Sequence, residues 1–308
     1  MPIVDTQRIV EPEQAGRIDK IVQELTGRSR ADVKGLFHHH CVARNEVECL
    51  NPGEPVVAGD VVRVRHDSHR RYHVSPPERG HAEFRLIHED DDVIIVDKAA
   101  GVLSVPTERE EGNTLLDLLS ARIARQRRRG RATAVHRLDR GTSGVLVFAK
   151  HQRAADALQT QFREHSVIRE YAAIVAGRLR ESTGTFRSRL RTGKDLRRFS
   201  VADDEPGEDA VTHYRVEQEL DRATLVRVTL ETGRRNQIRV HFAEAGHPVV
   251  GDDKYDPAAA RHRRWKAKRF ALHAAVLGFL HPLTKRAMRF ESPLPPEFVQ
   301  FVAGFPTT

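Results

Sequence analysis

The chain has 308 residues, enough for one large domain or two unequal ones. Lysine and arginine together number 51 against 43 acidic residues, and the formal net charge of +8 favours a polyanionic partner such as a nucleic acid. Two cysteines exclude a disulfide framework and a four-cysteine zinc site, and no apolar stretch approaches the ~20 residues that a membrane-spanning helix needs. The first 14 residues carry acids and no apolar segment, so we predict no secretion signal and a reducing, cytoplasmic location.

Residues 17–65 are predicted to form a small unit of helices and strands. Apolar residues recur at helical spacing over 18–25, and Gly27 ends that helix. Ser29 is a suitable N-cap for a second helix. Short strands separated by turn signals follow, the last of them at residues 61–64.

This layout resembles the alpha-L RNA-binding domain, in which two helices present basic residues to RNA and a short sheet lies behind them. Arg28, Arg30 and Lys34 lie on or beside the polar side of the second helix, and the resemblance implies that they bind RNA. We therefore predict an alpha-L-type RNA-binding domain with an N-terminal extension over residues 1–65. The three histidines at 38–40 do not predict a metal site, because consecutive helical side chains point in different directions and cannot hold one ion.

A linker is predicted over residues 66–82, which have no apolar periodicity and contain Pro76 and Pro77. From residue 83 to residue 308, short strands alternate irregularly with helices, and one buried strand is expected at 145–149. This pattern predicts an α+β fold and not a repeat of βαβ units. The sequence contains neither a phosphate-binding glycine loop nor a dinucleotide-binding fingerprint.

Basic residues concentrate in three stretches of this second part, at 121–140, 186–198 and 261–270. The first stretch holds eight arginines and a single acid, Asp139. Arginine binds phosphate through two parallel hydrogen bonds and stacks on bases, so these stretches are typical of a surface that binds RNA.

Asp139 lies in the segment HRLDRGTSG, residues 136–144, just before the buried strand. Arg137 and Arg140 flank it, and cationic neighbours favour the ionised carboxylate and lower its pKa. An ionised carboxylate can act as a nucleophile or as a general base. The same residue types are equally typical of a structural turn, in which Asp and Thr side chains bond nearby backbone N–H groups.

Five stretches, in order along the chain, resemble the motifs of the RluA-type pseudouridine synthases, which isomerise uridine to pseudouridine within RNA. They are DKAAGVLSVPT (97–107), HRLDRGTSGVLVFAK (136–150), REYAAIVAG (169–177), LETGRRNQIRVHFAEAGHPVVGDDKY (230–255) and ALHAAVLGFLHP (271–282). The resemblance implies a mixed, mainly antiparallel β-sheet with flanking helices and a central RNA cleft for residues 83–308. An N-terminal alpha-L domain is usual in one branch of that family.

The resemblance also implies a role for each matching residue. Asp139 is the catalytic carboxylate that attacks the uridine, and attack on the sugar, attack on the base and a glycal route all stay open. Tyr171 stacks on the target base near its departing proton, and Arg239 pairs with Asp139 and keeps it ionised. Further RNA contacts are expected from Arg137, Arg140 and Arg234, and Lys98 is expected either to bind phosphate of the RNA or to serve the structure. The motif histidines are expected to form structural hydrogen bonds: His136, His241 and His273.

Two positions depart from the family pattern. Asn236 stands where the family usually has His, and Ala99 stands where it usually has Pro. Neither is the nucleophile, and an asparagine still forms hydrogen bonds, so we expect activity to be kept. Arg234 is the second choice for the arginine paired with Asp139, and if residues 230–239 form a strand, Arg234 and Arg239 lie on its opposite faces.

The sequence therefore predicts an RNA pseudouridine synthase that works without cofactor or metal and extrudes its target uridine from the RNA helix. Large-subunit ribosomal RNA is the favoured substrate, and transfer RNA is the alternative. We expect a monomer that does not associate with membranes. A non-catalytic RNA-binding factor for ribosome assembly is the second hypothesis. An aspartate-based phosphohydrolase is disfavoured, because arginines and not metal-binding acids surround Asp139.

Overall fold

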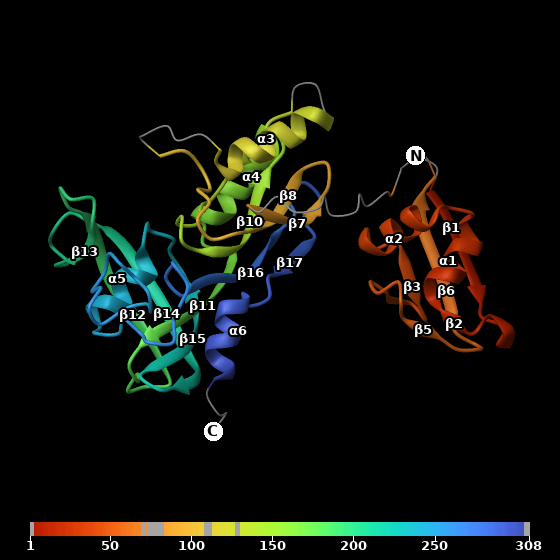
Figure 1. Cartoon of the computed structure of the whole chain (residues 1–308). Helices are drawn as coiled ribbons and strands as arrows, with labels where there is room; N and C mark the ends of the chain where they lie inside the picture. The colour runs from red at the N-terminus through yellow and green to blue at the C-terminus, as the bar shows by residue number, and fades with distance from the viewer. Residues whose placement is uncertain (1–2, 69–71, 73–82, 108–112, 127–129, 305–308) are drawn as a thin grey trace. The chain divides into compact units, whose positions relative to one another are not determined.

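The computed structural model describes the whole chain except residues 1–2, 69–71, 73–82, 108–112, 127–129 and 305–308 (Figure 1). The chain divides into two compact units, Met1–Arg79 and Gly80–Thr308. Most of the predicted linker, including both of its prolines, lies outside the described residues. No helix in the described ranges is long and apolar enough to cross a membrane.

The N-terminal unit combines a four-stranded antiparallel sheet, in the order β1-β6-β3-β4, with two helices and a separate β2–β5 pair. Its elements are β1 (Ile3–Ile9), a 3₁₀ turn (Pro12–Gln14), β2 (Gly16–Arg17), α1 (Ile18–Thr26), α2 (Arg30–His38), β3 (Val42–Arg44), β4 (Val47–Glu48), β5 (Pro55–Val56) and β6 (Val61–Asp67). As predicted, Gly27 ends α1 in the left-handed conformation, with φ of 62°. The Ser29 side chain caps α2 by accepting a hydrogen bond from the Asp32 N–H, which confirms the second helix start.

Strand β1 has no counterpart among the predicted elements. It pairs with β6 in antiparallel register along its whole length. Its side chains are alternately exposed and half-buried, so no apolar face marks the strand in the sequence. The unit also continues past residue 65, because β6 ends at Asp67, and the hydroxyl of the buried Tyr72 accepts a hydrogen bond from the Asp67 N–H.

The second unit is built on one large mixed sheet. Its elements are β7 (Phe84–Glu89), β8 (Val93–Lys98), α3 (Leu115–Gln126), β9 (Thr133–Ala134), β10 (Ser143–Ala149), α4 (Gln152–Arg163), β11 (Ile168–Ala176), β12 (Thr183–Thr192), β13 (Arg198–Val201), β14 (Glu208–Leu220), β15 (Ala223–Leu230), α5 (Gln237–Glu244), β16 (Leu272–Leu280), β17 (Ala287–Glu291) and α6 (Pro296–Ala303). The strand order is β13-β12-β14-β15-β11-β16-β10-β8-β7, with β17 beside β16 and β9 beside β10. Neighbouring strands are antiparallel except β10 and β16, which confirms the predicted α+β fold with a mainly antiparallel sheet.

Strands β8 and β10 are buried on both faces, and for β10 this confirms the buried strand predicted at residues 145–149. Alternate residues of a strand point to opposite sides of the sheet. On one side Ile94 packs in a core with Leu119 of α3, and on the other Val145 packs in a core with Leu158 of α4. The strand that follows Asp139 is therefore enclosed by helices on both sides.

Residues Gln237–Glu244 form helix α5, so the strand geometry considered for this segment does not apply. Arg234 precedes the helix, and Arg239 lies in its first turn. All residues from Gln237 to Phe242 are buried, and a helix that is buried all round has no polar face to mark it in the sequence.

Gly144 lies at the start of β10, where the chain pairs with Ala274 of β16 and has φ of +115°. A β-carbon at this position would lie 2.1 Å from the Ala274 carbonyl oxygen. We expect Gly144→Ala to lower the free energy of unfolding by about 3 kcal/mol or more, because backbone strain and overpacking add. Gly246→Ala is the matched control, since Gly246 has φ of +81° and a β-carbon added there would meet no atom within 4 Å. Backbone strain alone should lower the free energy of unfolding of this variant by about 1–2 kcal/mol. Equal losses in denaturant titrations would contradict the steric role of Gly144.

Candidate active site

One cleft in the second unit gathers five of the predicted site residues. Its volume is about 400 Å³, within the range of pockets that bind small molecules. The predicted residues in its lining are Arg137, Asp139, Tyr171, Arg234 and Arg239. They come from the loop between β9 and β10, from β11, and from α5 with the turn before it. The fold thus brings together residues that are far apart in the sequence.

Asp139 lies in residues 135–142, called here the aspartate loop, which ends where β10 begins. Ser104 holds the peptide just before Asp139: its hydroxyl accepts from the Leu138 N–H at 3.1 Å and donates to the Leu138 carbonyl at 2.9 Å. After Asp139 the chain turns, and the Thr142 N–H donates to the Asp139 carbonyl at 3.0 Å. The backbone on both sides of the carboxylate is therefore hydrogen-bonded.

Lys98, for which the sequence left open an RNA phosphate contact or a structural role, is fully buried. Its amine donates to the carbonyls of Ala99, Val102 and Arg140 at 2.9, 2.8 and 3.3 Å. Burial lowers the pKa of Lys98 to about 7, the charge of Arg269 adds to this change, and the charge of Asp139 opposes it. The RNA contact is therefore wrong for this residue and the structural role is supported, since the enclosed amine ties the end of β8 to the aspartate loop.

The Asp139 carboxylate is 22% exposed, and its burial raises its pKa above the ordinary value for an aspartate. Arg239, Arg137 and Lys98 oppose this rise. The sequence predicted the opposite direction, on the ground that arginines flank the residue. Both flanking arginines are exposed, so solvent weakens their effect while desolvation of the carboxylate raises its pKa.

Arg239 is buried, and its main partner is Asp252. Its Nε and Nη2 donate to the two Asp252 carboxylate oxygens at 2.6 and 2.7 Å, and the Asp252 side chain is not exposed at all. The remaining nitrogen, Nη1, lies 3.8 Å from Asp139 Oδ2, within the range of an ion pair. The ring of Phe270 lies 4.1 Å from the guanidinium carbon. Asp252 and Phe270 together hold the guanidinium so that Nη1 faces Asp139.

Tyr171 lies on β11, and its ring lines the same cleft although the residue is only 8% exposed. Burial raises the pKa of the Tyr171 hydroxyl, and Arg169 opposes the rise. The side chain is therefore a neutral phenol at neutral pH. A neutral ring can stack on a base or donate a hydrogen bond, but it does not supply a phenolate.

The three motif histidines form structural hydrogen bonds, as predicted. His136 accepts from the Val147 N–H at 3.1 Å. His241 contacts two hydroxyl groups, and His273 contacts a hydroxyl and a backbone carbonyl. Burial lowers the pKa of each ring, to about 3 for His136 and to about 4 for His241, so the rings are neutral at physiological pH.

The other residues of this unit that are predicted to contact RNA differ in whether their side chains are exposed or already paired within the protein. Arg137 is exposed at the cleft. Arg234 also lines the cleft, but its Nη1 pairs with Glu208 at 3.2 Å. Arg140 lies outside the cleft lining, and its Nε donates to the Gly101 carbonyl at 2.9 Å.

The predicted RNA contacts of the N-terminal unit lie on or just before α2. Arg30 and Lys34 are exposed. Arg28 is half-buried, donates to the Asp67 carbonyl at 3.4 Å and lies 5.4 Å from the centre of the Tyr72 ring. Arg28 therefore stabilises its own unit, while Arg30 and Lys34 present charge to the solvent.

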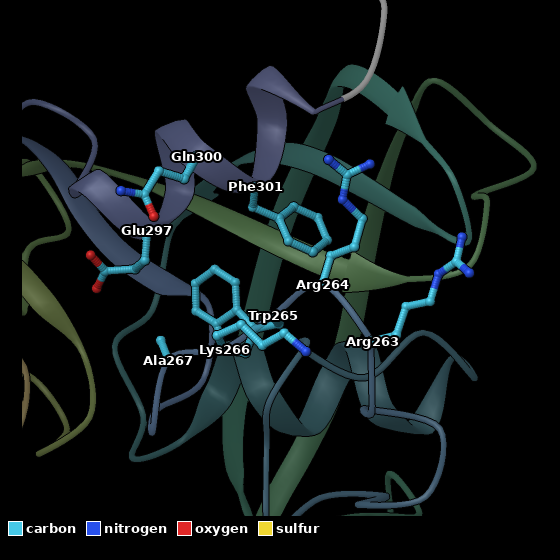
Figure 2. A pocket seen from close by; sticks show the side chains of 8 residues that line it. All are labelled: Arg263, Arg264, Trp265, Lys266, Ala267, Glu297, Gln300 and Phe301. Carbon is cyan, nitrogen blue, oxygen red and sulfur yellow. The ribbon is translucent and has the colours of Figure 1, made fainter.

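A second cavity, called here the basic cavity, has a volume of about 580 Å³ and lies between residues 263–267 and helix α6 (Figure 2). Its polar lining residues are Arg263, Arg264, Lys266, Glu297 and Gln300. The Trp265 ring packs edge-on against Phe301 at 5.8 Å and forms part of the wall. The basic cavity contains none of the residues to which the motifs assign chemistry.

Asp90, Asp92 and His281 place three potential metal-ligand atoms within 4.8 Å of one another. The Nδ1 of His281 accepts hydrogen bonds from the N–H groups of Leu283 and Thr284, so the ring proton is on Nε2. That Nε2 donates to Asp90 at 3.2 Å. A nitrogen that carries a proton cannot coordinate a metal, so this cluster is better described as a set of hydrogen-bonded ion pairs.

The profile of the RNA pseudouridylate synthase family matches residues 92–244, which include Asp139, Tyr171 and Arg239. A ribosomal large subunit pseudouridine synthase D of Xanthomonas campestris is 35% identical over 311 residues, covering 97% of this chain and 92% of that protein. The chain belongs to the RluA-type family of RNA pseudouridine synthases. It is an isomerase that acts on RNA, and the resemblance stated from the five motifs is confirmed.

The synthase is also similar to YhcT of Bacillus subtilis, an RNA pseudouridine synthase described as uncharacterized, with 37% identity and 93% of each chain covered. The solved structure of human RNA pseudouridylate synthase domain containing 1 is 26% identical, with a TM-score of 0.56 over 70% of this chain and 86% of that one. Human RNA pseudouridylate synthase domain containing 4 shares the fold, with a TM-score of 0.59 at 23% identity and coverage of 71% and 91%. The alpha-L assignment of the N-terminal unit stays a prediction.

Two residues of the site were not singled out in the sequence. Ser104 lies in the first motif of the synthase and Asp252 in the fourth, so the resemblance marked both segments. Neither residue has a chemical character that distinguishes it from a surface Ser or Asp. Their roles depend on partners distant in the chain, Leu138 and Arg239, which only the fold brings close.

Ser104→Ala removes the one hydroxyl that is hydrogen-bonded to both the N–H and the carbonyl of the buried Leu138. We expect the free energy of unfolding to fall by about 1–3 kcal/mol, and kcat to fall about tenfold because the aspartate loop is less well positioned. Denaturant titration and single-turnover kinetics measure the two effects. Ser182→Ala, at an exposed position, is the control, and a Ser104 variant that behaves like it would show that the Ser104 hydroxyl does not hold the loop.

Proposed function

We propose that this synthase converts uridine to pseudouridine in large-subunit ribosomal RNA, with Asp139 as the catalytic carboxylate. One observation carries the assignment of Asp139: among the described residues that line the cleft, it is the one carboxylate. Relatives with 31–38% identity that are named ribosomal large subunit pseudouridine synthase D favour this RNA as the substrate. Transfer RNA is the alternative substrate.

The reaction breaks the N1–C1′ bond of uridine and forms a C5–C1′ bond. The C5 carbon loses a proton and N1 gains one, so atoms and electrons balance without a redox cofactor. We propose that Asp139 supplies the nucleophile, whether it adds to the sugar or to the base or promotes a glycal. The detached uracil must turn before the new bond forms, and a cleft of about 400 Å³ can keep it next to the ribose.

Tyr171 and Arg137 fit complementary tasks in this reaction. The reacting atoms of a stacked uridine are inaccessible, so the nucleotide has to leave the helix at a cost of a few kcal/mol. The neutral ring of Tyr171 is suited to stack on the extruded base. Arg137 is exposed at the cleft and two residues from Asp139, where it can occupy the gap left in the RNA.

The N-terminal unit is proposed to recruit RNA as an alpha-L-type domain. Its two helices and short antiparallel sheet agree with that layout. The exposed Arg30 and Lys34 of α2 supply the positive charge that a phosphate backbone attracts.

The basic cavity is proposed to be part of the RNA-binding surface. The Arg263 side chain is 82% exposed and its ion pair is long, at 3.6 Å, while Lys266 is exposed. The same segment continues to Arg269, whose Nη1 donates to the Gly141 carbonyl at 3.3 Å and to Ser143 Oγ at 2.8 Å. The basic cavity is thereby joined to the aspartate loop through a short stretch of chain.

Asp139→Asn tests the proposed chemistry. On ribosomal RNA transcribed with uridine tritiated at C5, we expect the wild type to release tritium and the variant to be slower by about 10⁴-fold or more, with RNA affinity unchanged. Asp253→Asn, which alters an exposed carboxylate in the same unit, is the control and should keep full activity. Tritium release by the Asp139 variant at the wild-type rate would exclude the assignment, and binding without any release by the wild type would favour an RNA-binding factor.

The salt dependence of RNA binding tests the basic cavity. Each phosphate contact that is lost lowers the slope of log K against log salt by about 0.7–0.9. We expect the double variant Arg263→Ala with Lys266→Ala to lower this slope by about 1.4–1.8, with kcat unchanged at saturating RNA. Arg153→Ala, at an exposed position on α4, is the matched control. An unchanged slope in the double variant would place the RNA elsewhere.

A further inference from the structure

The closest hydrogen-bond donor to the Asp139 carboxylate is the amide of Asn236. With its nitrogen facing Asp139, Asn236 donates to Oδ2 at 2.8 Å and to Oδ1 at 3.2 Å. The Arg239 guanidinium is farther away, at 3.8 Å, and two of its nitrogens are occupied by Asp252. The amide therefore contacts both carboxylate oxygens, whereas the guanidinium acts on the carboxylate mainly through its charge.

The orientation of the amide follows from the hydrogen-bond partners on its other side. The Arg198 backbone N–H can only donate, and it lies 3.1 Å from Tyr255 Oη, so this hydroxyl accepts there. The single hydroxyl proton of Tyr255 is then available to the Asn236 oxygen at 3.0 Å. In the opposite orientation the Asn236 oxygen would face the carboxylate oxygens at 2.8 and 3.2 Å, and no proton would lie between these acceptors. The one hydrogen bond added by that orientation would be a 3.5 Å contact from Arg239.

The backbone at Asn236 also suits this role. Asn236 has φ of 57° and stands at the N-terminus of α5 without a side-chain capping bond, so its amide is directed away from the helix. Asn and His are among the residues that adopt positive φ more readily than most. Both also offer a side-chain N–H, which is consistent with an asparagine at a position where the family usually has histidine.

The series of hydrogen bonds that orients Tyr255, and through it Asn236, begins in the β12–β13 hairpin. Arg198, at the start of β13, supplies the N–H that orients Tyr255. The carbonyl of Leu196, in the turn of the same hairpin, accepts from Arg235 at 3.1 Å and from Lys254 at 3.0 Å. These contacts join the β12–β13 hairpin to Arg235, which precedes Asn236 in the chain, and to Lys254, which precedes Tyr255.

We propose that Asn236, oriented by Tyr255 and through it by the β12–β13 hairpin, is the positioning residue of the Asp139 carboxylate. This inference rests on the proposed catalytic role of Asp139. Asn236 holds the carboxylate in one rotamer and stabilises its ionised form, since its N–H bonds are made to the charged state. A purely structural asparagine would affect folding, but not the protonation of Asp139.

The test is the pKa of Asp139 itself, followed in the full-length protein by NMR of ¹³C-labelled aspartate carboxyls, with Asp139→Asn to assign the signal. The charged groups that face this carboxyl are Arg239, Arg137, Lys98 and Asp252, and the test variants leave all four in place. We expect Asn236→Ala to raise the Asp139 pKa by about one to two units, the effect of losing a hydrogen bond to a charged group. Activity should then be lost at a higher pH as the solution is acidified, because the ionised form is the active one. At pH above this transition kcat should still be lower and KM unchanged.

Two further variants separate positioning from folding. Asn236→His restores an N–H donor and should return the Asp139 pKa and kcat most of the way to the wild-type values. Tyr255→Phe frees the amide to turn and should raise the same pKa by a smaller amount. Asn113→Ala is the matched control, since Asn113 also has positive φ (59°) but is exposed, and it should leave the Asp139 pKa unchanged.

An Asp139 pKa that is the same in wild type, Asn236→Ala and Tyr255→Phe would overturn the inference, even if the enzyme is active. A shifted pKa in an enzyme that releases no tritium would support the hydrogen bond and contradict the proposed function instead. The two claims can therefore fail independently.

Discussion

A carboxylate is a nucleophile only when it is ionised, and burial disfavours the ionised form. The Asp139 side chain is only 22% exposed, and its burial raises its pKa. The other groups of the site therefore have to favour the ionised form of the carboxylate. Two groups do so. The Arg239 guanidinium is held by a buried bidentate pair with Asp252, and the Asn236 amide is held by the Tyr255 hydroxyl. Because each donor has a partner of its own, it is already oriented before RNA arrives, and little reorganisation is needed during the reaction.

The backbone around the carboxylate is restrained in a complementary way. Lys98 at the end of β8 and Ser104 in the segment after it hold the aspartate loop, and β10 continues the loop into a core that is buried on both faces. Gly141 brings the loop against Phe270, since a β-carbon there would lie 2.6 Å from the ring, and the same ring packs on Arg239. The loop and its cation are thus packed on one shared side chain. A change at Gly141 would be transmitted to both.

The sequence was most informative where function depends on residue type and local order. The motif resemblance assigned Asp139, Tyr171 and Arg239, and the fold places all three in one cleft, while the apolar run of β10 marked a buried strand. The sequence did not predict the features that depend on partners distant in the chain or on burial. Strand β1 is defined by its pairing with β6, and α5 has no polar face because it is buried all round. The enclosure of Lys98 and the direction of the Asp139 pKa both follow from desolvation, which the charges of sequence neighbours do not reveal.

The central claim is that the reacting uridine meets Asp139 in the cleft beside Tyr171. A crystal structure with RNA that carries 5-fluorouridine at the target position tests it most directly, because fluorine cannot leave C5 as a proton and the reaction stops on the enzyme. We expect the modified nucleotide to lie out of the RNA helix, with its base against the Tyr171 ring and its ribose or base in contact with the Asp139 carboxylate. A target nucleotide bound in the basic cavity, or in the cleft with Asp139 turned away from it, would contradict the account.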